Sequence, residues 1–400
     1  MKIETGQGQI TLWALLGIWS VSALTSLPGL AISPILGDLT TIFKNATDFD
    51  VQLLTTLPSL LVIPFILLAG KLSSTVGHVR LLYWGLSLFL LSGILYFFCD
   101  SITELILVSA LLGIGAGVIT PLSTALVSRF FVGRYRTAQF GYSSAINNLS
   151  LVAATAITGY LAEVQWRLPF LVYLLPIISL LLVRNIKNAG KVIAQPAEEP
   201  LHGGVPARSG INYGALWRLM LYYFLITFLV IIISVNFPFL MQEYGYDSGT
   251  SGLIISLFFL AIMLPGFFVG KVLAVVNVAV FRNSLMLIVI GLLVVCFSKN
   301  LAGIVAGVVV AGLGYGIAQP CVYDRTAAVA SGDKVTYAMA LVMTMNYVAI
   351  VLCPPIVDYL QQLSGIKSAT FAFALNSCIG GLALLVFFFV KNGEKRAHEE

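Results

Sequence analysis

Polar side chains recur at helical spacing inside one long apolar run of this sequence. One face of that run presents Gly312, Tyr315, Gln319 and Tyr323, at positions i, i+3, i+7 and i+11. A buried hydroxyl or carboxamide is unfavourable unless it has a hydrogen-bonding partner. Such a face can therefore either bond to a neighbouring helix or hold a small molecule through hydrogen bonds and ring stacking.

Four other apolar runs contain similar faces. They comprise Thr120 with Thr124; Ser143, Asn147 and Ser150; Tyr223, Thr227 and Ser234; and Met339, Met343, Asn346 and Ile350. Hydrogen bonding between helices remains an alternative for each of these residues. Uncharged aromatic, methionine and amide side chains favour a neutral or amphipathic organic ligand. The candidate binding residues are Asn147, Thr120, Thr124, Tyr223, Tyr315, Gln319, Tyr323, Met343 and Asn346.

Charged residues in or beside the apolar runs are few, and each is a functional hypothesis. Asp324 and Arg325 close the run that contains Gln319, about one turn after Pro320. Asp324 is expected either to form a gate or cap at the inner rim with Arg325, or to exchange a coupling proton. Asp38 and Asp358 are expected at the outer rim.

Several kinds of chemistry find no support in the residues. The three histidines, His78, His202 and His398, lie in polar segments, so none is expected to relay protons within the membrane. The five cysteines lack paired spacing, which predicts no disulfide, metal or cofactor. No zinc-protease or phosphate-binding motif occurs, so an enzyme and a nucleotide-driven pump are disfavoured. A receptor would need a signalling domain, and the sequence supplies none.

The composition places the chain in a lipid bilayer. Hydrophobic residues make up 59% and charged residues only 10%, with a mean hydropathy of +0.97, whereas soluble domains carry about 25% charged residues. Twelve runs approach the length of a membrane span. They cover approximately 12–35, 51–70, 81–99, 104–127, 138–161, 167–183, 217–240, 251–270, 283–297, 301–323, 336–360 and 368–390. The first run is too long for a signal sequence and is expected to remain as a helix.

The sequence repeats itself at about half its length. Gly113-Ile-Gly-Ala-Gly and Gly312-Leu-Gly-Tyr-Gly, each followed by a proline, are 199 residues apart (312 − 113). Asn147 and Asn346 have the same separation (346 − 147), and Gly70-Lys71 and Gly270-Lys271 are 200 apart (270 − 70). Parallel repeats of this kind are typical of a large class of transporters.

The distribution of lysine and arginine predicts the orientation. With the N-terminus inside, the inner segments contain 18 of the 22 basic residues and the outer segments contain four. Because basic residues accumulate on the cytoplasmic side, both termini are expected there. The formal net charge of +5 is explained by this topology and does not indicate a nucleic-acid partner.

Three motifs resemble those of the major facilitator superfamily, and within it the bacterial twelve-helix drug-efflux antiporters. The segment from Gly70 and Lys71 to Gly77 and Arg80 resembles the family's loop motif between its second and third helices. Gly113-x-Gly-x-Gly with Pro121 resembles the fourth helix, and Gly159-Tyr-Leu-Ala-Glu with Trp166-Arg167 resembles the exit of the fifth. The resemblance implies a central cavity lined by the first, fourth, seventh and tenth helices.

Departures from the family's pattern concern coupling. Ser74 stands where the loop motif has an aspartate, Thr75 where it has a basic residue, and Ser109 where the fourth helix has an arginine. Ala153-Ala154 lies where the antiporters carry Gly-Pro. The residues that the family uses to lock its outward-open state and to move protons are therefore missing.

The sequence thus predicts an all-α membrane protein of twelve helices in two pseudo-symmetric bundles, residues 1–183 and 217–390, joined by a cytoplasmic linker, 184–216, and followed by a tail, 391–400. We expect a monomeric secondary transporter in a bacterial inner membrane. It would export a small organic solute by alternating access, with protons as a candidate coupling ion. Proton- or ion-coupled uptake of a nutrient or organic anion is the alternative.

Overall fold

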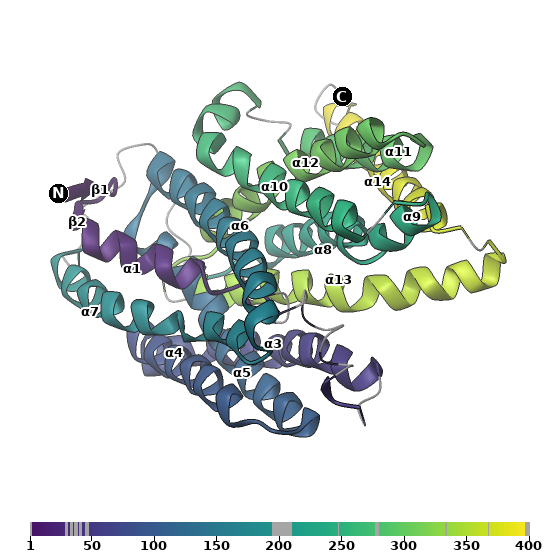
Figure 1. Cartoon of the computed structure of the whole chain (residues 1–400). Helices are drawn as coiled ribbons and strands as arrows, with labels where there is room; N and C mark the ends of the chain where they lie inside the picture. The colour runs from purple at the N-terminus through teal and green to yellow at the C-terminus, as the bar shows by residue number, and fades with distance from the viewer. Residues whose placement is uncertain are drawn as a thin grey trace. The chain divides into compact units, whose positions relative to one another are not determined.

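The computed structural model describes residues 2–28, 31–32, 35, 39, 42–44, 48–193, 210–246, 248–276, 280–332, 334–366 and 368–396 (Figure 1). Asp38 and residues 194–209 of the predicted linker lie outside these residues. The main helices of the first half are α1 (Leu12–Ser22), α3 (Asp48–Val76), α4 (His78–Leu95), α5 (Ile102–Phe130), α6 (Gly133–Val164) and α7 (Pro176–Ile193). Those of the second half are α8 (Tyr213–Val235), α10 (Ser248–Val276), α11 (Val280–Phe297), α12 (Leu301–Ala328), α13 (Lys334–Ser364) and α14 (Thr370–Arg396).

Among the described residues, ten helices are long and apolar enough to cross a membrane, and two shorter apolar helices cover Leu12–Ser22 and Thr370–Leu385. The predicted twelve-helix fold class is confirmed. Three further short helices are η2 (Tyr96–Phe98), η3 (Leu168–Leu174) and α9 (Phe237–Glu243).

The first span differs from its predicted extent, because α1 ends at Ser22 and turns follow it. Pro28 lies just beyond these turns, and proline disfavours helix in the residues that precede it. This run is mostly apolar and contains no charged residue, so hydropathy alone did not reveal the break.

An N-terminal hairpin was not expected from the sequence. Strands β1 (Lys2–Glu4) and β2 (Gln9–Thr11) pair antiparallel, with Ile3 opposite Ile10. Two hydrogen bonds hold the hairpin against the end of α5 and the turn that follows it. The Val132 amide donates to the Thr5 carbonyl (3.0 Å), and Gln7 Nε2 donates to the Arg129 carbonyl (2.8 Å). Local residue patterns could not predict this element, since it depends on contacts more than 100 residues away.

By compactness, the chain forms two units. Unit 1 contains Met1–Met220 and Val322–Tyr347, and unit 2 contains Leu221–Cys321 and Val348–Glu400. Unit 1 therefore includes the end of α12 and the beginning of α13, which belong to the second half of the sequence. The predicted boundaries of the two sequence halves remain a prediction.

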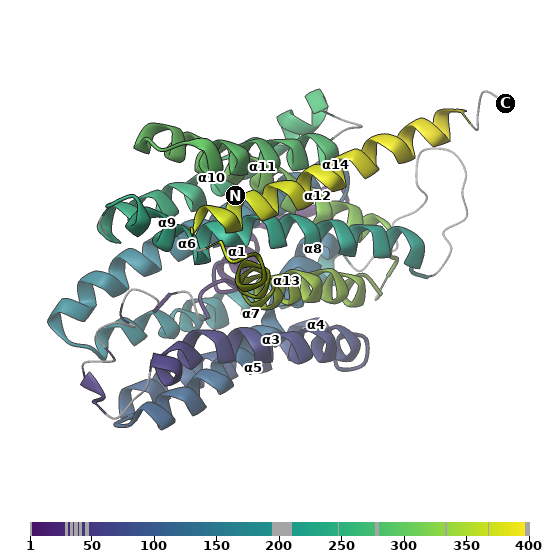
Figure 2. The same ribbon diagram turned by 90° about the vertical axis from the view of Figure 1, so that its right-hand side faces the viewer.

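In unit 1, the glycine repeat of α5 packs that helix against two neighbours at once. A Cβ atom on Gly113 would lie 2.6 Å from Pro58 Cα, and one on Gly117 would lie 2.9 Å from the Val62 carbonyl, both on α3. A Cβ on the central Gly115 would instead lie 2.7 Å from the Phe89 amide nitrogen on α4. Figures 1 and 2 show α3, α4 and α5 side by side.

Unit 2 repeats this arrangement. Gly312 and Gly316 of α12 approach the backbone carbonyls of Phe258 and Ile262 on α10, whereas Gly314 approaches Ser284 on α11. In each repeat the outer glycines, four residues apart, face one helix, and the central glycine faces another. The predicted role of these glycines in close helix packing is thereby confirmed.

The close approach gives a first prediction. Gly115→Ala should destabilise the protein by about 1–3 kcal/mol, since its methyl group would overlap backbone atoms of α4. Gly381→Ala, on α14, is the matched control: nothing lies within 4 Å of its Cβ position, so it should be neutral or stabilise the helix by up to about 1 kcal/mol. Apparent melting temperatures of the detergent-solubilised variants would measure both. Equal melting temperatures for the two variants would contradict this packing.

Candidate functional site

A polar and aromatic cluster lies between α8 and α12 in unit 2. Gln319 Nε2 donates a hydrogen bond to the Tyr223 hydroxyl (3.1 Å), and the Thr227 and Tyr315 hydroxyls are 3.3 Å apart. The rings of Tyr223 and Tyr315 are stacked, with centroids 6.5 Å apart and planes inclined by 19°. We call Tyr223, Thr227, Tyr315 and Gln319 the α8–α12 cluster.

The spacing of the α8–α12 cluster follows from the helices. Tyr223 and Thr227 are four residues apart on α8, and so are Tyr315 and Gln319 on α12, so that each pair lies on one helix face. Tyr223, Thr227 and Tyr315 are buried, and none of the four side chains is charged at neutral pH. The cluster can bind an uncharged partner by hydrogen bonding and stacking. The sequence predicted all four residues as members of polar faces, and the structure brings them together.

Other predicted binding residues lie in unit 1. The Thr124 hydroxyl donates to the Pro121 carbonyl (3.1 Å) and to Met343 Sδ on α13 (3.8 Å). Thr120 donates to the Ala116 carbonyl of its own helix (2.7 Å). The Tyr323 ring packs edge-on against Phe140, with centroids 5.9 Å apart. Asn346 is half-buried on α13.

Asn147 bonds to the turns that follow α1. Its Oδ1 accepts from the Thr25 hydroxyl (2.9 Å) and from the Ser26 amide (3.1 Å), and its Nδ2 donates to the Ser26 hydroxyl (2.6 Å). The Tyr347 hydroxyl donates to the Thr25 carbonyl (3.4 Å). Asn147 thus supplies hydrogen-bonding partners to the backbone and side chains of the turns where α1 ends. Helical spacing did not predict this role.

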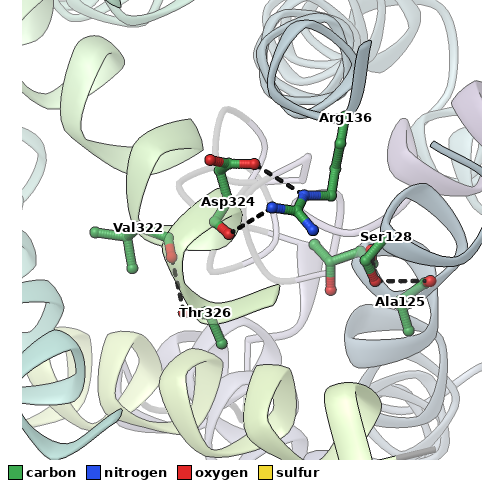
Figure 3. Close-up of polar contacts among 7 residues, drawn as sticks. Ala125, Ser128, Arg136, Val322, Asp324 and Thr326 are labelled. Atoms are coloured by element: carbon green, nitrogen blue, oxygen red, sulfur yellow. Dashed lines mark hydrogen bonds and ion pairs between the residues drawn. The ribbon is translucent and has the colours of Figure 1, made fainter. Parts of the chain in front are cut away.

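In unit 1 an ion pair joins α6 to α12, at the ends of these helices that are predicted to face the cytoplasm. Arg136 Nε lies 2.9 Å from Asp324 Oδ1, and Arg136 Nη2 donates to the Asp324 carbonyl (3.5 Å). Figure 3 shows the two side chains pointing toward each other, beside Ser128 of α5. Their side chains are only 19% and 22% exposed, so solvent screens the pair incompletely.

Sequence analysis identified Asp324 as a candidate residue but did not identify its partner. Arg136 was interpreted only as one of several basic residues in an inner loop. The adjacent Arg325 is exposed, and so is Asp358. In the part of the chain that the structure describes, no group of three or more histidine, cysteine or acidic side chains could hold a metal ion.

A second network surrounds His78, the first residue of α4. His78 Nε2 lies 2.6 Å from the Thr336 hydroxyl on α13, and Arg129 Nη1 of α5 lies 3.2 Å from His78 Nδ1. A cavity of about 280 Å³ adjoins the network and is lined by His78, Ala125, Ser128, Arg129, Gly332, Val335 and Thr336. His78 is only 8% exposed, a degree of burial that its place in a polar segment of the sequence did not predict.

The loop-motif residues have two kinds of role. A Cβ atom on Gly70 would collide with the Ala340 side chain, so this glycine allows α3 to approach α13 closely. Gly77 precedes α4 with φ of 87°, which favours glycine. Lys71 and Arg80 are exposed, and so is Ser74.

Comparisons with known proteins agree with this architecture. The sequence model of the Major Facilitator Superfamily matches residues 14–273 and 219–400. The proton:xylose symporter XylE has a similar structure, with a TM-score of 0.72, 14% identity and coverage of 94% of each chain. At that identity the likeness shows the fold alone.

Two bacterial relatives match over shorter stretches. The multidrug transporter protein MdtP of Bacillus subtilis is 29% identical over 147 residues, which are 36% of this chain and 26% of MdtP. The quinolone resistance protein NorA of Staphylococcus aureus is 30% identical over 114 residues, 28% of this chain and 29% of NorA. The matched stretches thus span less than a third of either relative. The family match covers nearly the whole sequence, and the chain belongs to the major facilitator superfamily of transporters.

Proposed function

We propose that this protein is a secondary active transporter that exports a small neutral or amphipathic organic solute by alternating access. The observation that supports it most is the α8–α12 cluster, in which two stacked tyrosines are joined to a threonine and a glutamine. Hydroxyl and amide groups of this kind orient an uncharged ligand, while the rings supply apolar contact area. MdtP is named a multidrug transporter and NorA a quinolone resistance protein, and an association with resistance favours export over uptake.

Membrane placement is part of the proposal. The bacterial relatives favour the bacterial inner membrane, and the excess of lysine and arginine in one set of loops favours both termini in the cytoplasm. The ends of α5, α6 and α12 that contain Arg129, Arg136 and Asp324 then lie on the cytoplasmic side. We take the protein to act as a monomer.

The Arg136–Asp324 ion pair serves as an inner gate in this proposal. It joins a helix of the first half of the sequence to one of the second half, and alternating access requires such contacts to break and re-form. The direct ion pair with Arg136 favours a gate for Asp324 over a proton-exchange role, since the carboxylate is already engaged by a side chain of another helix.

Counterflow in proteoliposomes is the direct test of function. Vesicles loaded with an unlabelled compound should accumulate the labelled compound for at least one neutral or amphipathic member of a chemical panel. Everted vesicles should then accumulate that compound when a gradient is imposed. Exchange confined to sugars or organic anions, with accumulation only in right-side-out vesicles, would instead support the uptake alternative.

The α8–α12 cluster gives the second prediction. Gln319→Leu removes an amide that in this proposal also hydrogen-bonds the solute, and the loss of a solute hydrogen bond of about 1 kcal/mol should raise the KM roughly fivefold. Tyr222→Phe is the matched control, since the neighbouring Tyr222 hydroxyl donates to the Phe281 carbonyl (2.8 Å) outside the cluster. It should lower the melting temperature and leave KM unchanged. An unchanged KM in Gln319→Leu would remove this residue from the binding site.

The ion pair gives the third prediction. Asp324→Asn should weaken inner closure by about 1 kcal/mol, as expected for a partly exposed pair, and should alter substrate exchange at equal pH and gradient-driven accumulation together. Arg325→Gln, at an exposed position, should alter neither. The double variant Arg136→Asp with Asp324→Arg should recover part of the activity.

A coupling role for Asp324 predicts a different pattern. Asp324→Asn would then lose only the accumulation driven by a pH gradient and keep exchange at equal pH. Observation of that pattern would contradict the gate and assign proton exchange to Asp324.

A further inference from the structure

One face of α4 is exposed along the membrane span that this helix begins, His78–Phe98. The opposite face is buried, and α4 packs against α5 and α7 (Figure 1). The exposed positions recur at i, i+4, i+7 and i+11, which is the spacing of a single helix face. They are Arg80, Trp84, Ser87 and Leu91. Because a membrane span is surrounded by lipid, this face contacts lipid over most of its length.

A groove lies along this face and has a volume of about 350 Å³. Its walls are side chains of α4, namely Tyr83, Trp84, Ser87, Leu88 and Leu91. Trp84 and Leu91 are 65% and 45% exposed, and about 10 Å of helix separates them. The mostly apolar walls and this length suit a stretch of a hydrocarbon chain. We call this feature the α4 groove.

Arg80 gives the α4 groove one charged end. It lies in the first turn of α4, four residues before Trp84, and side chains of a helix lean toward its N-terminus. That end of α4 is predicted to face the cytoplasm, so the guanidinium reaches the level of the lipid headgroups. The helix dipole adds partial positive charge at the same end.

No acidic side chain in α4 or the preceding part of α3 balances the charge of Arg80. The sequence from Val51 to Cys99 contains Lys71 and Arg80 but neither aspartate nor glutamate. Within the part of the chain that the structure describes, Arg80 makes no hydrogen bond or ion pair. Its guanidinium is therefore available to a ligand that enters the groove.

We propose that the α4 groove binds an anionic phospholipid, whose phosphate pairs with Arg80 while one acyl chain lies along Trp84 and Leu91. A guanidinium can bind phosphate oxygens through two parallel hydrogen bonds. A zwitterionic headgroup would also bring an ammonium group close to Arg80, where α4 offers no carboxylate to balance it. The site therefore prefers a headgroup with a net negative charge.

A second copy of this chain is the other occupant that could cover the α4 groove. In a twofold dimer the same face of α4 would meet itself. Arg80 would then face a helix that has no acidic residue, so the contact would bring like charges together without a partner for either. The charge pattern thus favours a lipid over self-association.

Quenching of Trp84 fluorescence by brominated lipids tests this site and requires no transported compound. The protein is reconstituted in phosphatidylcholine vesicles that contain a low mole fraction of brominated phosphatidylglycerol, or of brominated phosphatidylcholine with the same acyl chains. The emission of Trp84 is obtained as the difference between the wild type and Trp84→Phe. We expect phosphatidylglycerol to bind roughly fivefold more strongly, the effect of one basic residue near a membrane surface.

Variants assign this preference to the site. Arg80→Gln should bring the ratio of the two affinities to about one. Lys71→Gln is the matched control, because Lys71 is an exposed cation that does not line the groove, and it should keep the ratio of the wild type. Ser87→Phe should fill the groove, so native mass spectrometry in detergent should show less retained phosphatidylglycerol than in the wild type. Melting temperatures would confirm that the variants are folded.

Four results would overturn the proposal. The first two are equal affinities of both lipids in the wild type and a preference that persists in Arg80→Gln. The third is undiminished retention of phosphatidylglycerol in Ser87→Phe, which would place the lipid outside the groove. The last is the absence of Trp84 quenching by either lipid, which would mean that protein, such as a second copy of this chain, covers the groove.

Discussion

Close packing of helix backbones is the constraint on which the rest of this structure depends. In lipid the hydrophobic effect does not drive helices together, so contact area and hydrogen bonds must do so. The Gly-x-Gly-x-Gly segments of α5 and α12 meet this requirement, because glycine has no side chain and lets the backbone of each helix contact two neighbouring helices. Each of these two helices is held closely by its own neighbours. Helix packing therefore fixes the positions of Thr124, Tyr315 and Gln319 without a ligand.

Polar side chains then supply hydrogen bonds to backbone groups that helix packing leaves without partners. Asn147 bonds to the turns after α1, where the helix stops and leaves amides and carbonyls without helical partners. Such groups need internal partners at membrane depth. The Arg136–Asp324 and His78–Thr336 contacts differ in kind, since each joins helices from different halves of the sequence and can be broken without exposing a helix backbone.

The sequence predicted the fold class because hydropathy and the 199-residue repeat report directly on span length and on duplicated packing. It also predicted one polar face with Tyr223 and Thr227 and another with Tyr315 and Gln319, but not that these two faces meet. It could not predict Arg136 as the partner of Asp324, or the buried place of His78, because both depend on residues from distant helices. The end of α1 at Ser22 was not predicted for another reason: the residues that follow carry no charge, so hydropathy places them in the same membrane span.

The central claim is that the α8–α12 cluster binds the transported solute. Its most direct test is alkylation of a single cysteine at that place, Thr227→Cys, by a water-soluble maleimide, with and without a compound identified by counterflow. The account predicts that the compound slows alkylation, with half of the effect at a concentration near its transport KM. Alkylation that proceeds at the same rate in saturating compound would contradict it.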